Sequence, residues 1–367
     1  MNNDLLFQIA LMQVKGIGIT TAKQLEAHFG SAESVFSCKA NELAQIGGAG
    51  EQLFSSLQDK TALQRAEQEL EFAQKHGITV LHHRSEDYPS LLRTCPDAPF
   101  VLYYKGKLPA LRKPAIAVIG TRKATHYGRE LCDQFAAELA ALAPNVNILS
   151  GLAYGIDIAI HKAALDSGLS TVGVLAHGLD RIYPGQHRQS AVEMLAQGGL
   201  ITEFLSGTRP DKQNFVLRNR IVAGMASATV VVESASSGGA LITAGMASRY
   251  KRRLFAFPGR IGDAQSEGCL ALLKNKQADL IVSAADLIER MEWTPALHSA
   301  GVQRKLFPEL TAEETKVVSL LAIAPSRMDE MSLTMDLPVH KLSALLFEME
   351  LKGLIRAYPG GIYKRMV

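Results

Sequence analysis

Cysteine is scarce in this sequence, and its four cysteines lie too far apart to form a recognisable site. They are Cys38, Cys95, Cys132 and Cys269 of the 367 residues, and no two of them make a C-x-x-C pair. This spacing is typical neither of a disulfide framework nor of a zinc site, and it fits a reducing compartment. An H-E-x-x-H motif is also absent. We therefore expect no metal site.

Signals for export or membrane insertion are missing as well. The first 18 residues, MNNDLLFQIALMQVKGIG, contain no basic leader, and Gln8 and Gln13 interrupt their apolar stretch. No segment approaches the roughly 18 uninterrupted apolar residues of a membrane-spanning helix. We expect a cytoplasmic protein with no membrane partner. The net charge of +3 permits a polyanionic ligand but does not require one.

The common nucleotide and catalytic signatures are absent too. The run GTRKATHYG at 120–128 is not G-x-G-x-x-G, and no G-x-x-x-x-G-K-[ST] occurs. Ser150 lies in no G-x-S-x-G motif. Asp157 and His161 are one helical turn apart and could act as acid and base, but a helix-capping aspartate beside a packed histidine is the simpler interpretation. We expect no catalytic residue and no cofactor.

The first predicted domain covers residues 1–70 and reads as short helices. Gly16-Ile17-Gly18 precedes one helical pattern, TTAKQLEAHFG, and a looser echo at 46–50 precedes another, EQLFSSLQ. A Gly-x-Gly turn between helices is typical of helix-hairpin-helix or SAM-like modules, whose exposed helical amides accept a DNA phosphate. A packing module with tight turns would look the same, and both interpretations stay open.

The second predicted domain covers residues 71–290. Seven apolar runs, from AIAVIG at 115 to ADLIVS at 278, alternate with amphipathic helical patterns. This alternation predicts an α/β fold, a Rossmann-like doubly wound parallel sheet with helices on both faces. The runs GITVLHH and FVLYYKG, between 71 and 112, indicate extra strands or a connector leading into that sheet.

Residues 291–309 lack periodicity and are predicted to be a linker. The last domain, 310–367, holds three helical patterns and then LIRAYPGGIYKRM, two short strands about a turn. Its first helix begins with a Thr-x-x-Glu capping box in TAEET. This order predicts a winged helix. Its would-be recognition helix is poor in arginine and lysine, so duplex binding and a protein-contact role both stay open.

Small residues follow several strands of the predicted sheet, where ligands of such folds bind. Gly120-Thr121-Arg122 follows the first parallel strand. The later loops contribute Ser150, Gly151, Gly155, Ser237, Gly238 and the pair Pro258-Gly259. Small residues let backbone amides approach an anion, and each loop precedes a helix whose dipole favours negative charge. We expect these loops to form one phosphate-accepting edge.

A basic segment follows the fourth parallel strand and should reach the same edge. The run 209–220 brings Lys212, Phe215, Arg218, Asn219 and Arg220 near Arg122. Guanidinium and ammonium groups suit phosphate oxygens, and an aromatic ring can stack on an unpaired base, so the combination favours single strands over duplex. Arg218 and Arg220 could instead be partly structural, through Glu203 or Glu233.

The order and spacing of these motifs resemble the DNA-processing protein A family (DprA, also called Smf). The matching runs are GTR at 120, SGLAYGID at 150, GLDRIYP at 178, FVLRNRIVAG at 215, SSGGALITA at 236 and FPG at 257. The resemblance implies cooperative binding of single-stranded DNA, a homodimer formed through the Rossmann-like domain, and loading of the RecA recombinase in natural transformation.

The resemblance also assigns residues. It implies that Arg122 and Lys212 contact DNA, that Phe215 stacks on a base, and that Arg218 and Asn219 form the family's RN pair. Three positions depart from the family pattern. Tyr154 stands where a basic residue is common, Gly239 where serine is common, and Val216 where proline often follows the phenylalanine.

Two other functions compete with this interpretation. A nucleotide-processing hydrolase resembling the lysine-decarboxylase-like phosphoribohydrolases would carry PGGxGTxxE, whereas this chain has SSGGALITA, with Ala240 in place of the second glycine and Glu233 before the loop. An adaptor working through the terminal domains would bind no oligonucleotide with its central domain.

Overall fold

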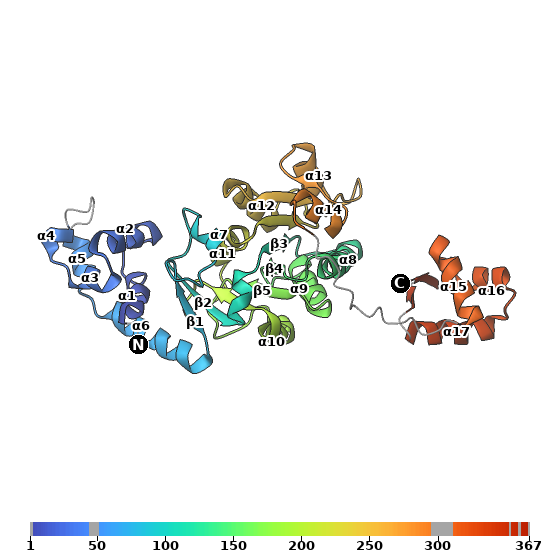
Figure 1. Cartoon of the computed structure of the whole chain (residues 1–367), viewed down its shortest axis with the longest axis horizontal. Coiled ribbons are helices and arrows are strands. Elements are labelled where there is room, and N and C mark those ends of the chain that lie inside the picture. Colours follow the sequence, from blue (N-terminus) through green and yellow to red (C-terminus); the bar gives the residue numbers. More distant parts are fainter. Residues whose placement is uncertain (1–2, 44–50, 295–310, 352–353, 359–360, 366–367) are drawn as a thin grey trace. The chain divides into compact units, whose positions relative to one another are not determined.

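The computed structural model describes residues 3–43, 51–294, 311–351, 354–358 and 361–365. The chain divides into two compact units, Met1–Leu297 and His298–Val367 (Figure 1). The first unit therefore joins the predicted helical domain and the predicted sheet domain. Most of the predicted linker, from 295 to 309, lies outside the described residues.

The helical part begins the first unit and packs on the sheet. Its helices are α1 (Asn3–Leu11), α2 (Ile19–Phe29), α3 (Ala32–Ser37), α4 (Ala40–Leu43), α5 (Glu51–Leu57) and α6 (Thr61–His76). α2 begins directly after Gly18, which offers no side-chain cap, and Gly16 has a φ of 91°. The second glycine turn, apart from its flanking helices, lies outside the described residues. The expected domain boundary at residue 70 falls inside α6.

One sheet of nine strands forms the centre of the first unit. Its strands are β1 (Thr79–His82), β2 (Val101–Gly106), β3 (Ala115–Ile119), β4 (Asn147–Ser150), β5 (Ser170–Val174), β6 (Gly199–Thr202), β7 (Ala228–Val231), β8 (Arg253–Ala256) and β9 (Asp279–Leu280). They lie in the order β1-β2-β6-β5-β4-β3-β7-β8-β9. From β6 to β9 every pair is parallel, as the alternating runs predict. β1 and β2 join at one edge as antiparallel strands, so the segment 71–112 does supply extra strands.

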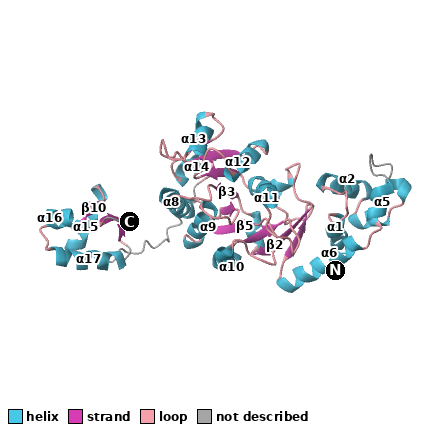
Figure 2. Ribbon diagram, turned by 180° about the vertical axis from the view of Figure 1, so that it is seen from behind, coloured by secondary structure: helices cyan, strands magenta, loops and turns pink. Residues whose placement is uncertain are grey.

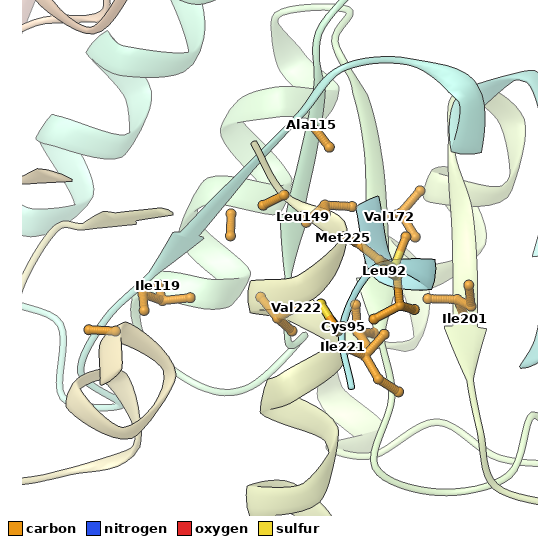
Figure 3. Close-up of a cluster of buried hydrophobic side chains, with 14 of the residues drawn as sticks. Leu92, Cys95, Ala115, Ile119, Leu149, Val172, Ile201, Ile221, Val222 and Met225 are labelled. Carbon is orange, nitrogen blue, oxygen red and sulfur yellow. The ribbon is translucent and has the colours of Figure 1, made fainter. Parts of the chain in front are cut away.

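Helices cover both faces of this sheet (Figure 2). The alternation of side chains along β3 explains why: Ala115, Ala117 and Ile119 enter one core, while Ile116 and Val118 enter the other. The first core includes side chains of α7 (Ser90–Arg93), the 3-10 helix η1 (Leu108–Arg112), α11 (Lys212–Met225), α12 (Gly239–Arg249) and α13 (Glu267–Lys274). Figure 3 shows part of it, where Ile221 and Met225 of α11 approach Leu92 and Cys95.

The second core lies under α8 (His126–Leu142), α9 (Ile156–Asp166) and α14 (Ala284–Arg290). A smaller cluster joins α9 to α10 (Arg188–Gln197), which follows the 3-10 helix η2 (Gly185–His187). A further core packs the N-terminal helices against Phe100, Val101 and Tyr103 at the β1–β2 edge. Arg65 of α6 adds a polar link, donating to the Ser206 carbonyl at 2.6 Å.

The second unit is a three-helix, three-strand module. It contains α15 (Ala312–Ile323), β10 (Ser326–Arg327), α16 (Met328–Met335), α17 (Val339–Leu351), β11 (Ile355–Tyr358) and β12 (Ile362–Arg365). The strands pair in the order β10-β12-β11. The capping box of Thr311 and Glu314 is present at the start of α15. The predicted winged helix is confirmed.

Candidate nucleic-acid groove

A groove of about 700 Å³ lies at the ends of the parallel strands. The chain leaves β3 toward β4 on one side, and β7 lies on the other side of β3, so the strand order reverses here. Such a switch point leaves a crevice between the loops that diverge from neighbouring strands. Segments following β3, β4 and β7 line it, together with one face of α11. The predicted small-residue edge and the predicted basic segment therefore meet in one place.

The loops after β3 and β4 are locked together. Ile156 N–H donates to the Thr121 carbonyl at 3.1 Å, and Thr121 N–H donates to the Glu233 carbonyl at 2.8 Å. Gly155 has a φ of 76°, and a Cβ there would lie 2.1 Å from the Thr121 oxygen. Only glycine allows this close approach. The packing fixes the backbone from which Arg122 projects into solvent.

The start of α12 is the most open helix terminus in the groove. Ser237, Gly238 and Gly239 are exposed, and Gly238 provides no side-chain cap. Gly238 also has a φ of 149°, a conformation that side chains disfavour. The first amides of the helix are therefore available to a ligand anion, and the helix dipole favours negative charge there.

One face of α11 carries the cation and the aromatic ring. Lys212, Phe215, Asn219 and Val222 recur at helical spacing, and all four line the groove. Asp211 caps this helix by accepting from Gln213 N–H at 2.9 Å. The Arg122 guanidinium carbon lies 5.2 Å from the centroid of the half-buried Phe215 ring, a cation–π arrangement.

Arg218 lines the groove but is only 3% exposed. Its guanidinium donates to the Val174 carbonyl at 2.9 Å and packs so close to Gly151 that a Cβ there would lie 1.7 Å from Nη1. Burial lowers the pKa of Arg218 to about 10, against the opposing charge of Asp157. The side chain therefore stays positive at neutral pH and acts from the floor of the groove.

Arg220 lies outside the groove. It forms a buried ion pair with Glu203 and donates to the Asp97 carbonyl. The structural role considered from sequence is confirmed for this arginine, with Glu203 as its partner. Glu233, the other candidate partner, instead accepts from the backbone N–H of Thr125 at 2.9 Å and from its hydroxyl.

Ser150 and Gly155 do not line the groove either, and the predicted Pro258-Gly259 loop also lies outside its lining. The Ser150 side chain is fully buried, and its hydroxyl donates to the Val118 carbonyl at 2.7 Å. Gly155 instead shapes the loop junction. The structure does bring together the remaining eight: Arg122, Gly151, Lys212, Phe215, Arg218, Asn219, Ser237 and Gly238.

The packed histidine of the simpler interpretation is present, but Asp157 does not cap α9, whose N-cap is Gly155 without a side-chain hydrogen bond. The Asp157 carboxylate accepts from Gly151 N–H at 3.1 Å and from Ala153 N–H at 3.4 Å, before the first turn of α9. Burial raises the pKa of Asp157, while the Arg218 charge opposes that rise. His161 packs against Thr171, with Nδ1 2.7 Å from its hydroxyl, and burial lowers the pKa of His161 to about 3.

Sequence reasoning did not single out two side chains near this groove. Lys123 lines it beside Arg122. Its position next to a predicted DNA-contacting arginine is a sequence signal that could have identified it. Tyr183 is 46% exposed, and its ring centroid lies 6.0 Å from that of Phe215. Tyr183 lies in GLDRIYP, one of the runs that carry the family resemblance, and the resemblance assigns it no role.

The fold and groove define a class: a Rossmann-like α/β protein with a crevice at its switch point and a separate winged helix. Comparison with known proteins is more specific. A model of the family "DNA recombination-mediator protein A" matches residues 79–292, and one of the "DprA winged helix domain" matches 305–361. The chain belongs to this family, as the resemblance in its motifs predicts.

Similar proteins span the chain. Protein Smf of Synechocystis is 29% identical and covers 99% of both chains, and Protein Smf of Escherichia coli is 36% identical over 76% of this chain and 75% of its own. The X-ray structure of DNA processing protein A from Streptococcus pneumoniae has a TM-score of 0.65 at 28% identity, covering 77% of this chain and 97% of its own.

A second solved structure is described by its ligand. The structure of DNA processing protein A from Helicobacter pylori is described as giving insight into a unique single-stranded DNA binding mode. It has a TM-score of 0.53 and 29% identity, and covers 59% of this chain and 95% of its own.

Across the part of this chain that the structure describes, no helix has both the length and the apolar composition needed to span a bilayer.

Proposed function

We propose that this chain binds single-stranded DNA along the switch-point groove. The observation that carries the proposal is the coincidence of three features in that groove: exposed cations at Arg122 and Lys212, uncapped amides at the start of α12, and an accessible ring at Phe215. Cations and amides suit phosphate oxygens. An aromatic ring suits the face of an unpaired base, which a duplex hides.

Arg218 strengthens the groove without needing direct contact. Its buried charge offsets that of Asp157, so the floor opposes a polyanion less than an uncompensated carboxylate would. Asp157 is the one acidic side chain among the described residues that line the groove, and its two backbone donors together with Arg218 compensate its charge. The groove should therefore attract a polyanion, because little negative charge opposes its exposed cations.

The biological setting follows from the family resemblance. We propose that the chain is a cytoplasmic homodimer, formed through its Rossmann-like domain, that protects incoming DNA and loads a RecA recombinase onto it during natural transformation or recombination. We also propose that it does so without catalysis. A phosphoribohydrolase-type rival would need a glutamate after the glycine loop, where SSGGALITA has none, and Glu233 before the loop has both carboxylate oxygens engaged by Thr125.

A gel-shift comparison of single- and double-stranded oligonucleotides tests the binding proposal. We expect the single strand to be preferred and its affinity to fall steeply with salt, because phosphate contacts release counterions. Arg122→Ala and Lys212→Ala should weaken binding without loss of folded protein. Arg249→Ala is the matched control, since Arg249 is exposed in the last turn of α12, at the end opposite Gly238.

Three outcomes would count against the proposal. Normal binding by both groove variants would mean that the DNA binds elsewhere. If Arg249→Ala weakened binding equally, the loss would reflect the lower net charge of the protein and not a contact in the groove. Release of free base from a nucleoside monophosphate would favour the hydrolase instead. Recombinase loading is tested separately, by asking whether the full chain accelerates RecA filament formation on a strand coated with single-strand-binding protein.

A further inference from the structure

Glu26, His82 and His83 form a cluster of potential metal ligands, and none of the three lines the switch-point groove. Glu26 lies in α2 of the helical part, whereas His82 ends β1 and His83 follows it. The potential ligand atoms of all three lie within 4.8 Å of one another. The Glu26 side chain is 2% exposed, and those of His82 and His83 are 8% and 13% exposed. The ligands come from distant segments, so short-motif inspection of the sequence could not find them.

The distances in this cluster are close to those of a coordination sphere. His82 Nε2 lies 3.1 Å from Glu26 Oε1 and 2.8 Å from His83 Nδ1. Ligand atoms about 2.0–2.1 Å from a tetrahedral zinc ion are roughly 3.3 Å apart. A small outward movement of the two rings would therefore admit an ion.

The three groups converge on one ring nitrogen, His82 Nε2, which faces both the Glu26 carboxylate and His83 Nδ1. A neutral imidazole nitrogen carries either one hydrogen or one lone pair. If His82 Nε2 donates to Glu26, it has no lone pair for His83 and only one hydrogen to share. If it accepts from His83 Nδ1, its lone pair faces the carboxylate. Glu26 Oε2 accepts no hydrogen bond despite its burial, although the Arg84 guanidinium lies 3.3 Å away. A cation among three lone pairs would engage all three groups at once.

We propose that Glu26, His82 and His83 bind one divalent transition-metal ion of the zinc class, which joins α2 to the end of β1. Two imidazoles and one carboxylate suit zinc, whereas magnesium and calcium prefer oxygen ligands throughout. The fourth position is left to water. The ion would tie the N-terminal helices to the sheet edge, in addition to their shared apolar core.

Neighbouring side chains support the proposed ligands. Arg84 Nε lies 3.3 Å from Glu26 Oε2, and Gln8 Nε2 donates to Glu26 Oε1 at 3.3 Å. A metal on Oε1 leaves the Arg84 pair in place, so that pair would orient the carboxylate as outer-shell partners do. The Arg84 side chain is half exposed, which places solvent beside the cluster and provides a path for an ion.

The test is titration of the full, chelator-treated chain with Co²⁺, followed by competition with Zn²⁺. We expect one Co²⁺ per chain, with the visible absorption of a four-coordinate ion, and displacement by Zn²⁺. His83→Gln and Glu26→Gln should each weaken binding by at least the roughly 10–100-fold that loss of an outer-shell partner costs. Zinc should also raise the Tm of the wild-type chain as its concentration rises, and should not do so in His83→Gln.

A matched control separates this site from adventitious histidine binding, since the chain has ten histidines. His28 lies in the same helix as Glu26 and is exposed, so His28→Gln should leave affinity and spectrum unchanged. Circular dichroism checks that each variant is folded. Stoichiometric binding retained in folded His83→Gln, or a cobalt spectrum that stays that of the hydrated ion, would overturn the proposal.

Discussion

The arginines and lysines around the groove fall into two groups that differ in what their charges contact. Arg122 and Lys212 are exposed on the rim, where solvent and a ligand can reach them. Arg218 and Arg220 belong to the same helix as Lys212, yet both are buried, and each donates to a backbone carbonyl. The rim charges are open to a ligand, whereas the two buried arginines hold neighbouring segments in place, Arg218 from the floor of the groove and Arg220 outside it.

Helical geometry produces this difference. Lys212, Phe215 and Asn219 lie on one face of α11, and Arg220 points toward Glu203 on the other side of the helix. Arg218 is intermediate, since it lines the groove from beneath Gly151. The three cations of α11, Lys212, Arg218 and Arg220, therefore separate into two roles once the helix forms.

The largest expected effect comes from the floor. Arg218→Met should lower the free energy of unfolding by up to about 3 kcal/mol, because it removes the buried hydrogen bond to the Val174 carbonyl and the charge that favours the ionised Asp157 carboxylate. Arg122→Met, the same change on the rim, should alter it by less than about 0.5 kcal/mol. Urea unfolding followed by circular dichroism measures both. Equal unfolding midpoints for the two variants would show that the buried arginine stabilises the fold no more than the exposed one.

The next effect concerns the aromatic ring. Phe215→Ala should weaken single-strand binding by about 1–3 kcal/mol, the contribution of one base–aromatic stack, while the unfolding midpoint changes little since the ring is half exposed. Phe215→Tyr keeps the ring and serves as the control. Fluorescence anisotropy with a labelled oligonucleotide gives both affinities. If Phe215→Leu bound the oligonucleotide as tightly as Phe215→Tyr, the ring would contribute an apolar contact and not a stacking interaction.

The rim cations should appear in the salt dependence. Each single-strand phosphate contact contributes roughly 0.7 to the slope of log K against log salt. Arg122→Ala and Lys212→Ala should each reduce the slope by about that amount, and the double variant by about twice as much. Anisotropy titrations between 50 and 200 mM salt measure it. An Arg218→Met slope that falls equally would mean that the floor arginine also reaches a phosphate.

Much of this arrangement is predictable from sequence because the signals are local. Apolar runs alternating with helical patterns identify every parallel strand from β3 to β9, and turn-forming glycines mark the loops that meet at the switch point. The capping box of α15 depends on two residues three positions apart, so it is equally visible.

The rest depends on contacts between distant segments. The sequence leaves Glu203 and Glu233 as alternative partners for Arg220, and only the folded structure pairs Arg220 with Glu203 and the Asp97 carbonyl. Ser150 is a second example, because its hydroxyl donates a hydrogen bond to the Val118 carbonyl of the neighbouring strand and is not available to a ligand. Residue type and loop position therefore predict which side chains approach the groove, whereas tertiary packing decides which of them keep a free polar group.

Tyr154 allows the smallest and sharpest test of where the groove ends. It stands where a basic residue is common in the family, and it is 42% exposed. Its ring lies edge-on to His187, with centroids 5.2 Å apart, and it is not among the described residues that line the groove. Tyr154→Lys should therefore change the salt slope by less than half of the roughly 0.7 expected for one phosphate contact. Tyr154→Gln, without the added charge, is the control. A full increase of about 0.7 for the lysine variant alone would extend the path of the DNA across the loop between β4 and α9.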